Sequence, residues 1–139
     1  MSRRLAAINA SPLIYLARAE HLELLRLAGD ELIVPAIVAA EILVREADDP
    51  TVRALNDNAW LQQVDAPPPP SEVLLWNLGA GESAVISWAL AHPGCRAVID
   101  DLQGRRCAEA LNVPLRGTLG LVLRAKRMGV IPRARPLMK

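Results

Sequence analysis

Short apolar runs that alternate with helical patterns constrain the fold of this chain more than any other feature. The runs hold three to five residues each, and each is followed by a stretch with apolar residues at helical spacing. The runs cover residues 5–8, 31–34, 60–64, 97–99 and 113–115, and the helical stretches cover 11–28, 35–47, 51–59, 71–78, 82–91, 102–111 and 119–127. The alternation predicts an α/β domain with a mostly parallel central sheet and helices on both faces.

Length and composition limit the class of protein further. The 139 residues fit one compact domain, residues 1–139, and the apolar share of 52% excludes intrinsic disorder for most of the chain. No apolar run reaches the roughly 20 residues that a membrane helix needs, so we expect no membrane partner. Cys95 and Cys107 are too few for a disulfide framework, and this favours the reducing cytoplasm as the location. Both are expected to be small buried side chains.

The charge is unevenly distributed along the chain. Residues 1–95 carry 6 basic and 12 acidic side chains, whereas residues 96–139 carry 10 basic and 3 acidic ones. A basic C-terminal third is typical of a protein that binds a phosphate-bearing partner. The alternative is an ordinary solvated surface, because arginine is abundant throughout the chain.

Polar residues follow two of the predicted strands directly. Asn9 ends the first strand, and Asp100 and Asp101 follow the strand at 97–99. Ligands of open parallel sheets bind beyond the carboxyl ends of the strands, so a site is expected there. Side chains alternate along an extended chain, so one of the two aspartates should face the site and the other could cap the next helix.

Two glutamates belong to the same pattern. Glu41 shares a helical face with Ile37 and Val44, and a carboxylate on a buried apolar face needs a hydrogen bond, an ion pair or a metal. Glu82 follows Gly79-Ala80-Gly81 and precedes inward-facing apolar residues, although an acid in a first helical turn is also explained by the helix dipole. The alternative for Glu41 is a side chain that reaches solvent at the margin of the stripe.

Together these residues predict a metal site. Carboxylates from Glu41, Glu82 and Asp100 or Asp101 would repel one another unless a cation lay among them. Oxygen ligands without His or Cys favour Mg²⁺ or Mn²⁺, and such a site suits hydrolysis of a phosphodiester. Ser11 and Thr118 are expected to cap helices, and the Thr118 hydroxyl could also contact the site. Arg105 and Arg106 could bind phosphate or pair with the aspartates.

Six motifs in order then resemble one family, over nearly the whole chain. They are I-N-A-S-P-L-I at 8–14, V-P-A-I-V-A-A-E-I at 34–42, L-G-A-G-E-S-A at 78–84, V-I-D-D at 98–101, G-R-R at 104–106 and G-T-L-G at 117–120. The set resembles the PIN-domain superfamily, in particular its PIN-like subfamily that opens with N-A-S-P-L and closes with G-T-L-G. The resemblance implies a three-layer α/β/α Rossmann-like domain and Mg²⁺- or Mn²⁺-dependent ribonuclease activity. Many relatives are toxins of toxin–antitoxin pairs and form homodimers.

The resemblance also assigns roles by position. Glu41 resembles the second acid of the family, Glu82 the third, and Asp100 or Asp101 the fourth, while Ser11 and Thr118 match hydroxyls that line the site. Asn9 stands where the family has its first acid, so one charge is missing from the ligand set. An amide oxygen can still coordinate a metal, and asparagine is usual here in the N-A-S-P-L subgroup.

Our leading hypothesis from the sequence is a cytoplasmic metal-dependent endoribonuclease, the toxin of a toxin–antitoxin pair, with an RNA substrate and an antitoxin partner. Arg105, Arg106 and Arg116 are the expected phosphate contacts. One alternative is a catalytically weak or inactive PIN-like module that binds RNA or a protein, which Asn9 favours. Another is a DNA-directed nuclease with the same site.

Overall fold

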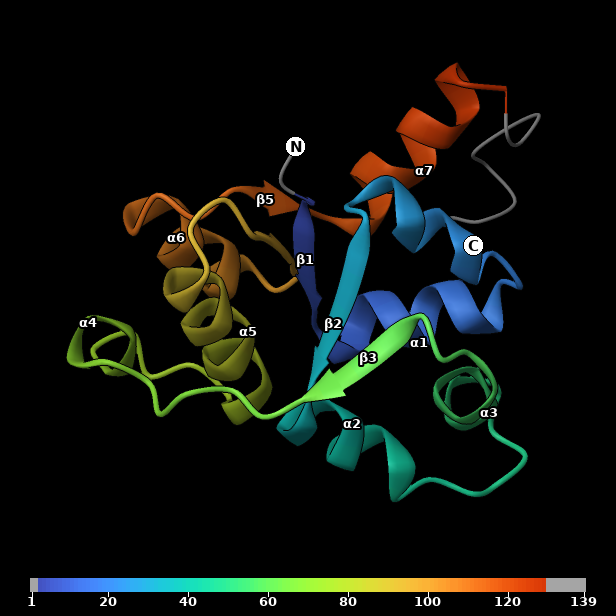
Figure 1. Cartoon of the computed structure of the whole chain (residues 1–139), viewed down its shortest axis with the longest axis horizontal. Helices are drawn as coiled ribbons and strands as arrows, with labels where there is room; N and C mark the ends of the chain where they lie inside the picture. Colours follow the sequence, from blue (N-terminus) through green and yellow to red (C-terminus); the bar gives the residue numbers. More distant parts are fainter. Residues whose placement is uncertain (1–2, 130–139) are drawn as a thin grey trace.

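A computed structural model, which describes residues 3–129, contains a five-stranded sheet in which every pairing is parallel. Its order is β3-β2-β1-β4-β5, so β1 lies at the centre (Figure 1). The strands are β1 (Leu5–Ile8), β2 (Glu31–Pro35), β3 (Leu61–Val64), β4 (Arg96–Val98) and β5 (Leu115–Arg116). The parallel sheet predicted from the alternating pattern is confirmed, although β5 begins two residues later than expected.

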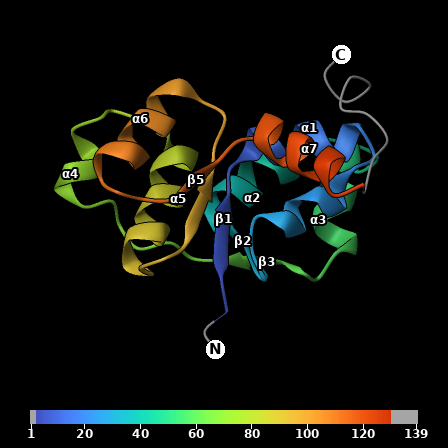
Figure 2. The same cartoon turned by 90° about the horizontal axis from the view of Figure 1, so that it is seen from above.

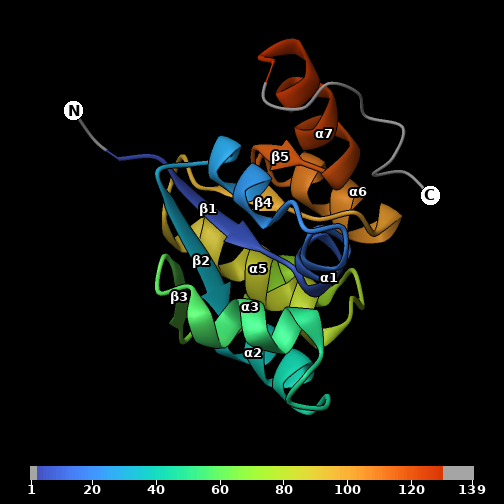
Figure 3. The same ribbon diagram turned by 90° about the vertical axis from the view of Figure 1, so that its right-hand side faces the viewer.

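Helices cover both faces of this sheet and make a three-layer domain. They are α1 (Ala10–Arg18), α2 (Ala36–Leu43), α3 (Pro50–Asp57), α4 (Ser71–Leu74), α5 (Ala80–Ala91), α6 (Leu102–Ala110) and α7 (Thr118–Arg127), with a 3₁₀ helix, η1, at Leu22–Leu27. The helix α5 packs on one face against β1, β2 and β4, and α6 adjoins it. On the other face lie α1, α3 and α7 (Figures 2 and 3).

The centre of the sheet is buried because both layers press on it. Ala6, Ala7 and Ile8 of β1 have no exposed surface, and neither do Ala97 and Val98 of β4. A continuous apolar strand, rather than one that alternates apolar and polar residues, is typical of a parallel strand covered on both faces. The buried strand pair therefore gives the polar residues that follow it a rigid base.

Three helices are shorter than the sequence pattern predicted. The expected helix at 11–28 is divided into α1 and η1, because Glu20 between them adopts a left-handed φ of 61°. The helix predicted at 35–47 ends at Leu43. The one predicted at 71–78 ends at Leu74, and Asn77 beyond it also has a positive φ. A left-handed residue cannot continue a right-handed helix, and the apolar spacing did not reveal these turns.

The carboxyl ends of β1 and β4 lie side by side. The backbone N–H of Asn9, directly after β1, donates to Val98 O of β4 at 3.0 Å. The chain moves from β1 to β2 on one side, whereas β4 lies on the other, so the strand order reverses between β1 and β4. This is the place where ligands bind in open parallel sheets.

Among the helices within residues 3–129, none has the length and apolar character required to span a bilayer.

Candidate functional site

Asn9 is a buried polar residue with one atom left without a partner. It lies directly before α1 and is 3% exposed. Its Nδ2 donates a hydrogen bond to Glu82 Oε2 at 3.2 Å, which joins the end of β1 to the start of α5. Its Oδ1 is buried and accepts no hydrogen bond from the described residues. A buried acceptor without a donor costs free energy, so this oxygen marks a position where a ligand would be favoured.

A carboxylate oxygen of Glu41 lies near the same place, and the absence of a side chain at Gly81 leaves space between it and Asn9. Gly81 is buried in the first turn of α5, and a Cβ atom there would lie 3.0 Å from Asn9 Oδ1 and 3.3 Å from Glu41 Oε1. The missing side chain therefore leaves room where the amide oxygen of Asn9, directly after β1, and the carboxylate of Glu41, in α2, approach α5. Sequence reasoning missed Gly81; a glycine in the first turn, beside an acid, was the available signal.

The sequence argument that Glu41 lies on a buried apolar face was wrong. Ile37 and Val44, which share its helical face, are 48% and 83% exposed, and Glu41 is exposed too. The helix instead buries Val38, Ala39 and Ile42, because that side packs on α5 and the sheet. The apolar stripe alone did not indicate which side of α2 faces the core. Glu41 is therefore not a buried charge that requires compensation.

The two adjacent aspartates have different partners, as the alternation of side chains predicted. Asp101 caps α6, and its Oδ2 accepts the Gly104 backbone N–H at 2.9 Å. Asp100 instead accepts two hydrogen bonds from Thr118, at 2.7 Å from the backbone N–H and at 2.6 Å from the hydroxyl. Thr118 is the first residue of α7, so Asp100 fixes the start of that helix to the end of β4.

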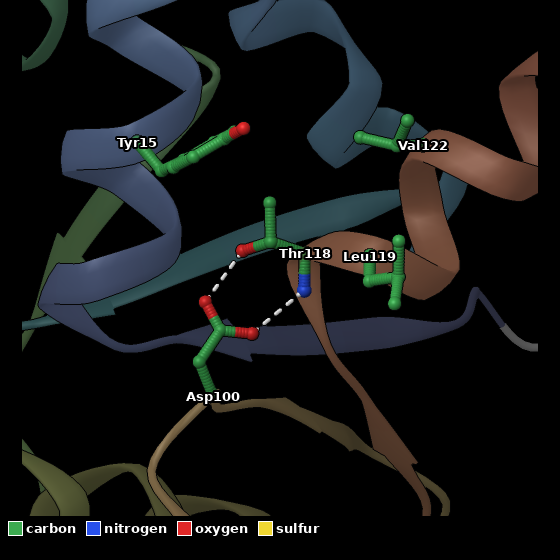
Figure 4. Close-up of a pocket in the computed structure, with 5 residues that line it drawn as sticks. All are labelled: Tyr15, Asp100, Thr118, Leu119 and Val122. Carbon is green, nitrogen blue, oxygen red and sulfur yellow. Dashed lines mark hydrogen bonds between the residues drawn. The ribbon is translucent and has the colours of Figure 1, made fainter. Parts of the chain in front are cut away.

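A hollow opens beside this pair of residues. Figure 4 shows Asp100 and Thr118 at its floor, with Tyr15 of α1 on one side and Leu119 and Val122 of α7 on the other. Apart from the Asp100 and Thr118 groups and the Tyr15 hydroxyl, its walls are apolar. Asp100 thus follows β4, the strand that pairs with β1, and also lines an open hollow.

A comparison with known families agrees with the parallel α/β fold. A family model described as a PIN domain matches residues 5–139, which is almost the whole chain. The chain belongs to the PIN-domain family. A search of curated proteins gives no significant match. The resemblance read from the six motifs is therefore confirmed, and this chain has a nuclease-type fold.

PIN domains typically use divalent metal ions, so we tested whether the residues present fit one. Within residues 3–129, no three His, Cys, Asp or Glu side chains lie close enough together to form a metal site by themselves. The group formed by Asn9, Glu41 and Glu82 instead combines an amide oxygen with carboxylates. A buried amide oxygen without a hydrogen bond beside carboxylates is a donor set that suits a hard divalent cation.

The two hydroxyl residues and the three arginines expected at the site differ in exposure and in their contacts. Thr118 contacts Asp100 as described, whereas Ser11 is exposed in the first turn of α1, and Asn9 rather than Ser11 precedes that helix. Arg105 turns inward and donates from Nη1 to Ile99 O at 2.9 Å. Arg106 is exposed and Arg116 is half-buried. Within residues 3–129, neither Arg105 nor Arg106 forms an ion pair with the aspartates; the pairs found there join Arg18 and Arg45 to Asp49.

Proposed function

We propose that this PIN domain is an endoribonuclease that cleaves RNA phosphodiesters with the help of Mg²⁺ or Mn²⁺. The observation that carries the proposal is the buried Oδ1 of Asn9, which finds no hydrogen-bond donor within residues 3–129 and lies beside the same Gly81 position as Glu41 Oε1. A divalent cation would satisfy this oxygen and balance the carboxylates.

The side chains proposed to hold the ion come from separate stretches of the chain. Glu41 and Glu82 would hold it directly or through water, and Asn9 would contribute its amide oxygen. Asp100, which forms no three-acid cluster with these glutamates within residues 3–129, would act on the ion through water. Asn9 also orients Glu82 through the 3.2 Å hydrogen bond. When bound, the ion lowers the pKa of an attacking water and stabilises the charge of the leaving oxygen.

Asp100 is preferred to Asp101 because of what each already does. Asp101 uses Oδ2 to cap α6, whereas Asp100 lines the open hollow and keeps free lone pairs beside its two bonds to Thr118. Thr118 would act as a positioning residue that holds the carboxylate. We expect Asp100→Asn to lower cleavage at least about a hundredfold and Asp101→Asn to lower it less than about threefold.

The decisive assay is cleavage of single-stranded RNA by the purified full chain. We expect cleavage with Mg²⁺ or Mn²⁺, loss of cleavage in excess chelator, and a loss of at least about a hundredfold in Glu41→Gln and in Glu82→Gln. Glu46→Gln, an exposed charge change just after α2, serves as the matched control. Undiminished cleavage in chelator would contradict the proposal. Single-stranded DNA of the same sequence, run in parallel, separates an RNA-directed from a DNA-directed enzyme.

A weak or inactive module is the second candidate, and Asn9 supports it. Asn9 supplies an N–H to Glu82 where an acid would supply charge, so the site has one negative charge fewer. Mn²⁺ titration of the wild type and of Asn9→Asp distinguishes the two. Similar binding in both proteins supports the working enzyme, and tight binding only in Asn9→Asp supports the inactive module.

The proposed biological role is that of the toxin in a toxin–antitoxin pair, as a cytoplasmic homodimer. Growth arrest on expression of the wild type, absent with Glu82→Gln, would support this role, as would a neighbouring gene for a small DNA-binding antitoxin. Sedimentation of the purified chain tests the dimer. We further propose that Arg116, with Arg105 and Arg106 nearby, contacts the RNA backbone.

A further inference from the structure

Three hollows join end to end along α7. The hollow of Figure 4 shares Asp100 and Leu119 with a second one, whose lining adds Arg105, Arg116 and Leu123. The second shares Arg116, Gly120 and Leu123 with a third, which continues to Arg124 and Arg127. We call the third, lined by Arg116, Gly120, Leu123, Arg124 and Arg127, the α7 groove. Neighbouring hollows therefore follow one another from Asp100, which is proposed to act on the ion, to the end of α7.

We propose that single-stranded RNA extends from the candidate metal site along α7, with its phosphates in the α7 groove and one unpaired base in the hollow beside Tyr15. The inference rests on the proposed ribonuclease function and adds the path of the substrate. It assigns Arg124, Arg127 and Tyr15 to substrate binding.

The charge of the α7 groove supports a polyanion. Its charged lining residues are all arginines, and within residues 3–129 the ion pairs closer than 4.0 Å involve Asp49 alone as the acid. A further arginine, Arg96, lies nearby and donates from Nη1 to Ala28 O at 3.1 Å. Burial lowers the pKa of Arg96, and repulsion from Arg116, Arg4 and Arg124 lowers it further. Among residues 3–129, these guanidiniums therefore lie near one another without an ion pair to a carboxylate.

The shape and the apolar surfaces favour a single strand of nucleic acid over other anions. A Cβ at Gly120 would contact nothing within 4 Å, so the floor of the α7 groove is open. Leu123 of the α7 groove is 39% exposed, and Leu119, which lines the two adjoining hollows, is 49% exposed. Tyr15 lies across the hollow from α7 (Figure 4). Single strands bind where cationic side chains follow the backbone and aromatic or apolar side chains contact the bases.

The binding experiment uses the full chain in excess chelator, so that binding is measured without cleavage. The probe is a fluorescent 12-nucleotide single-stranded RNA, and the readout is polarisation at several salt concentrations. We expect Arg124→Gln/Arg127→Gln to raise the Kd about tenfold and to reduce the slope of log K against log salt by about 1.4, the value expected when two phosphates of a single strand are no longer neutralised. The control Arg45→Gln/Arg53→Gln removes the same charge from exposed sites and should stay within about twofold.

Tyr15 tests the base contact separately. We expect Tyr15→Leu to raise the Kd about tenfold and Tyr15→Phe to leave it within about twofold, because the ring rather than the hydroxyl stacks on a base. Thermal unfolding by circular dichroism confirms that each variant is folded.

Several outcomes would overturn the inference. They are an α7 groove variant that binds RNA as its control does, a duplex RNA that competes as well as a single strand, and an acidic peptide that displaces RNA at equal charge concentration. The last result would assign the groove to an acidic protein segment. If the wild type cleaves RNA but the groove variants bind normally, this inference alone fails. If the groove binds RNA but no metal supports cleavage, the proposed function alone fails.

Discussion

Two surfaces of this PIN domain carry opposite charge. One is acidic and lies around Asn9, and the other is basic and lies along α7. At the carboxyl edge of the sheet, Glu41 and Glu82 lie beside the buried Asn9 oxygen, which accepts no hydrogen bond from the part of the chain that the structure describes. Along the α7 groove, Arg116, Arg124 and Arg127 lie together without an acid paired to them among residues 3–129. We propose that the first surface binds a cation and that the second binds an anion. A metal ion and an RNA backbone would supply both, so the two surfaces should respond differently to the same assays.

The largest effect should come from adding one carbon atom to the acidic surface. In Gly81→Ala the new Cβ would lie 3.0 Å from Asn9 Oδ1 and 3.3 Å from Glu41 Oε1. We expect cleavage to fall at least about a hundredfold, because the space proposed for the ion is filled. RNA binding in chelator should stay within about twofold of the wild type, since the α7 groove is unchanged.

Stability separates this effect from misfolding. Gly81 lies in a helix, where alanine is favoured over glycine by roughly 1 kcal/mol, so the melting temperature should not fall steeply. A Gly81→Ala protein that cleaves RNA at the wild-type rate would remove the distinction between the two surfaces.

The next effect concerns Asp100 and Thr118, where the two surfaces meet. Thr118→Val keeps the backbone N–H bond to Asp100 but removes the hydroxyl that donates at 2.6 Å. Thr118 is 7% exposed, so we expect the free energy of unfolding to fall by about 1–2 kcal/mol, measured by urea denaturation. Thr118→Val should also lower RNA cleavage, because Asp100 loses the hydroxyl that holds it, and Thr118→Ser, which keeps the hydroxyl, should cleave RNA faster than Thr118→Val. Equal cleavage by the Val and Ser variants would show that the hydroxyl does not position Asp100.

The smallest effect comes from a carboxylate that already has its partners. The Thr51 backbone N–H, 2.8 Å from Asp49 Oδ1, lowers the pKa of Asp49 below 3.8, and Arg45 and Arg18 lower it further. A lowered pKa stabilises the fold above 3.8, and this contribution is lost as the pH falls through the folded-state pKa. Asn is also a good cap, so Asp49→Asn should lower the melting temperature only slightly at pH 7.

The same variant should approach the wild type as the pH falls below 3.8. RNA cleavage at neutral pH should not change. A gap in melting temperature that stays constant down to low pH would show that the charge of Asp49 contributes nothing to stability.

The sequence predicted the parallel sheet and placed Asn9 and Asp100 after the ends of two of its strands, because strand ends and helical periods are local features. It did not predict which face of α2 is buried, since the face that carries Ile37, Glu41 and Val44 was expected to be buried and is exposed. Nor could it predict the contact of Gly81 with Asn9, which joins residues 72 positions apart in the chain. Such contacts depend on how α5 packs across β1, and local spacing carries no signal for that packing.

The α7 groove was only partly visible in the sequence. The basic C-terminal third predicted a phosphate-bearing partner. Arg105 was expected to bind phosphate or pair with the aspartates; within residues 3–129 it forms no ion pair with them and donates to Ile99 O. Arg124 and Arg127 gave no specific signal because arginines on an exposed helix are common. Their alignment with Arg116 depends on how α7 follows β5, which the sequence pattern does not specify.

Calorimetric titration of Mn²⁺ into the metal-free protein tests the central claim most directly, because it measures the ion without requiring a substrate. We expect at least one Mn²⁺ to bind per wild-type chain, with affinity lowered at least about tenfold in Glu41→Gln, Glu82→Gln and Gly81→Ala, and unchanged in Arg124→Gln/Arg127→Gln. Equal Mn²⁺ affinity in the wild type and in all three acidic-surface variants would contradict the site formed by Asn9, Glu41 and Glu82.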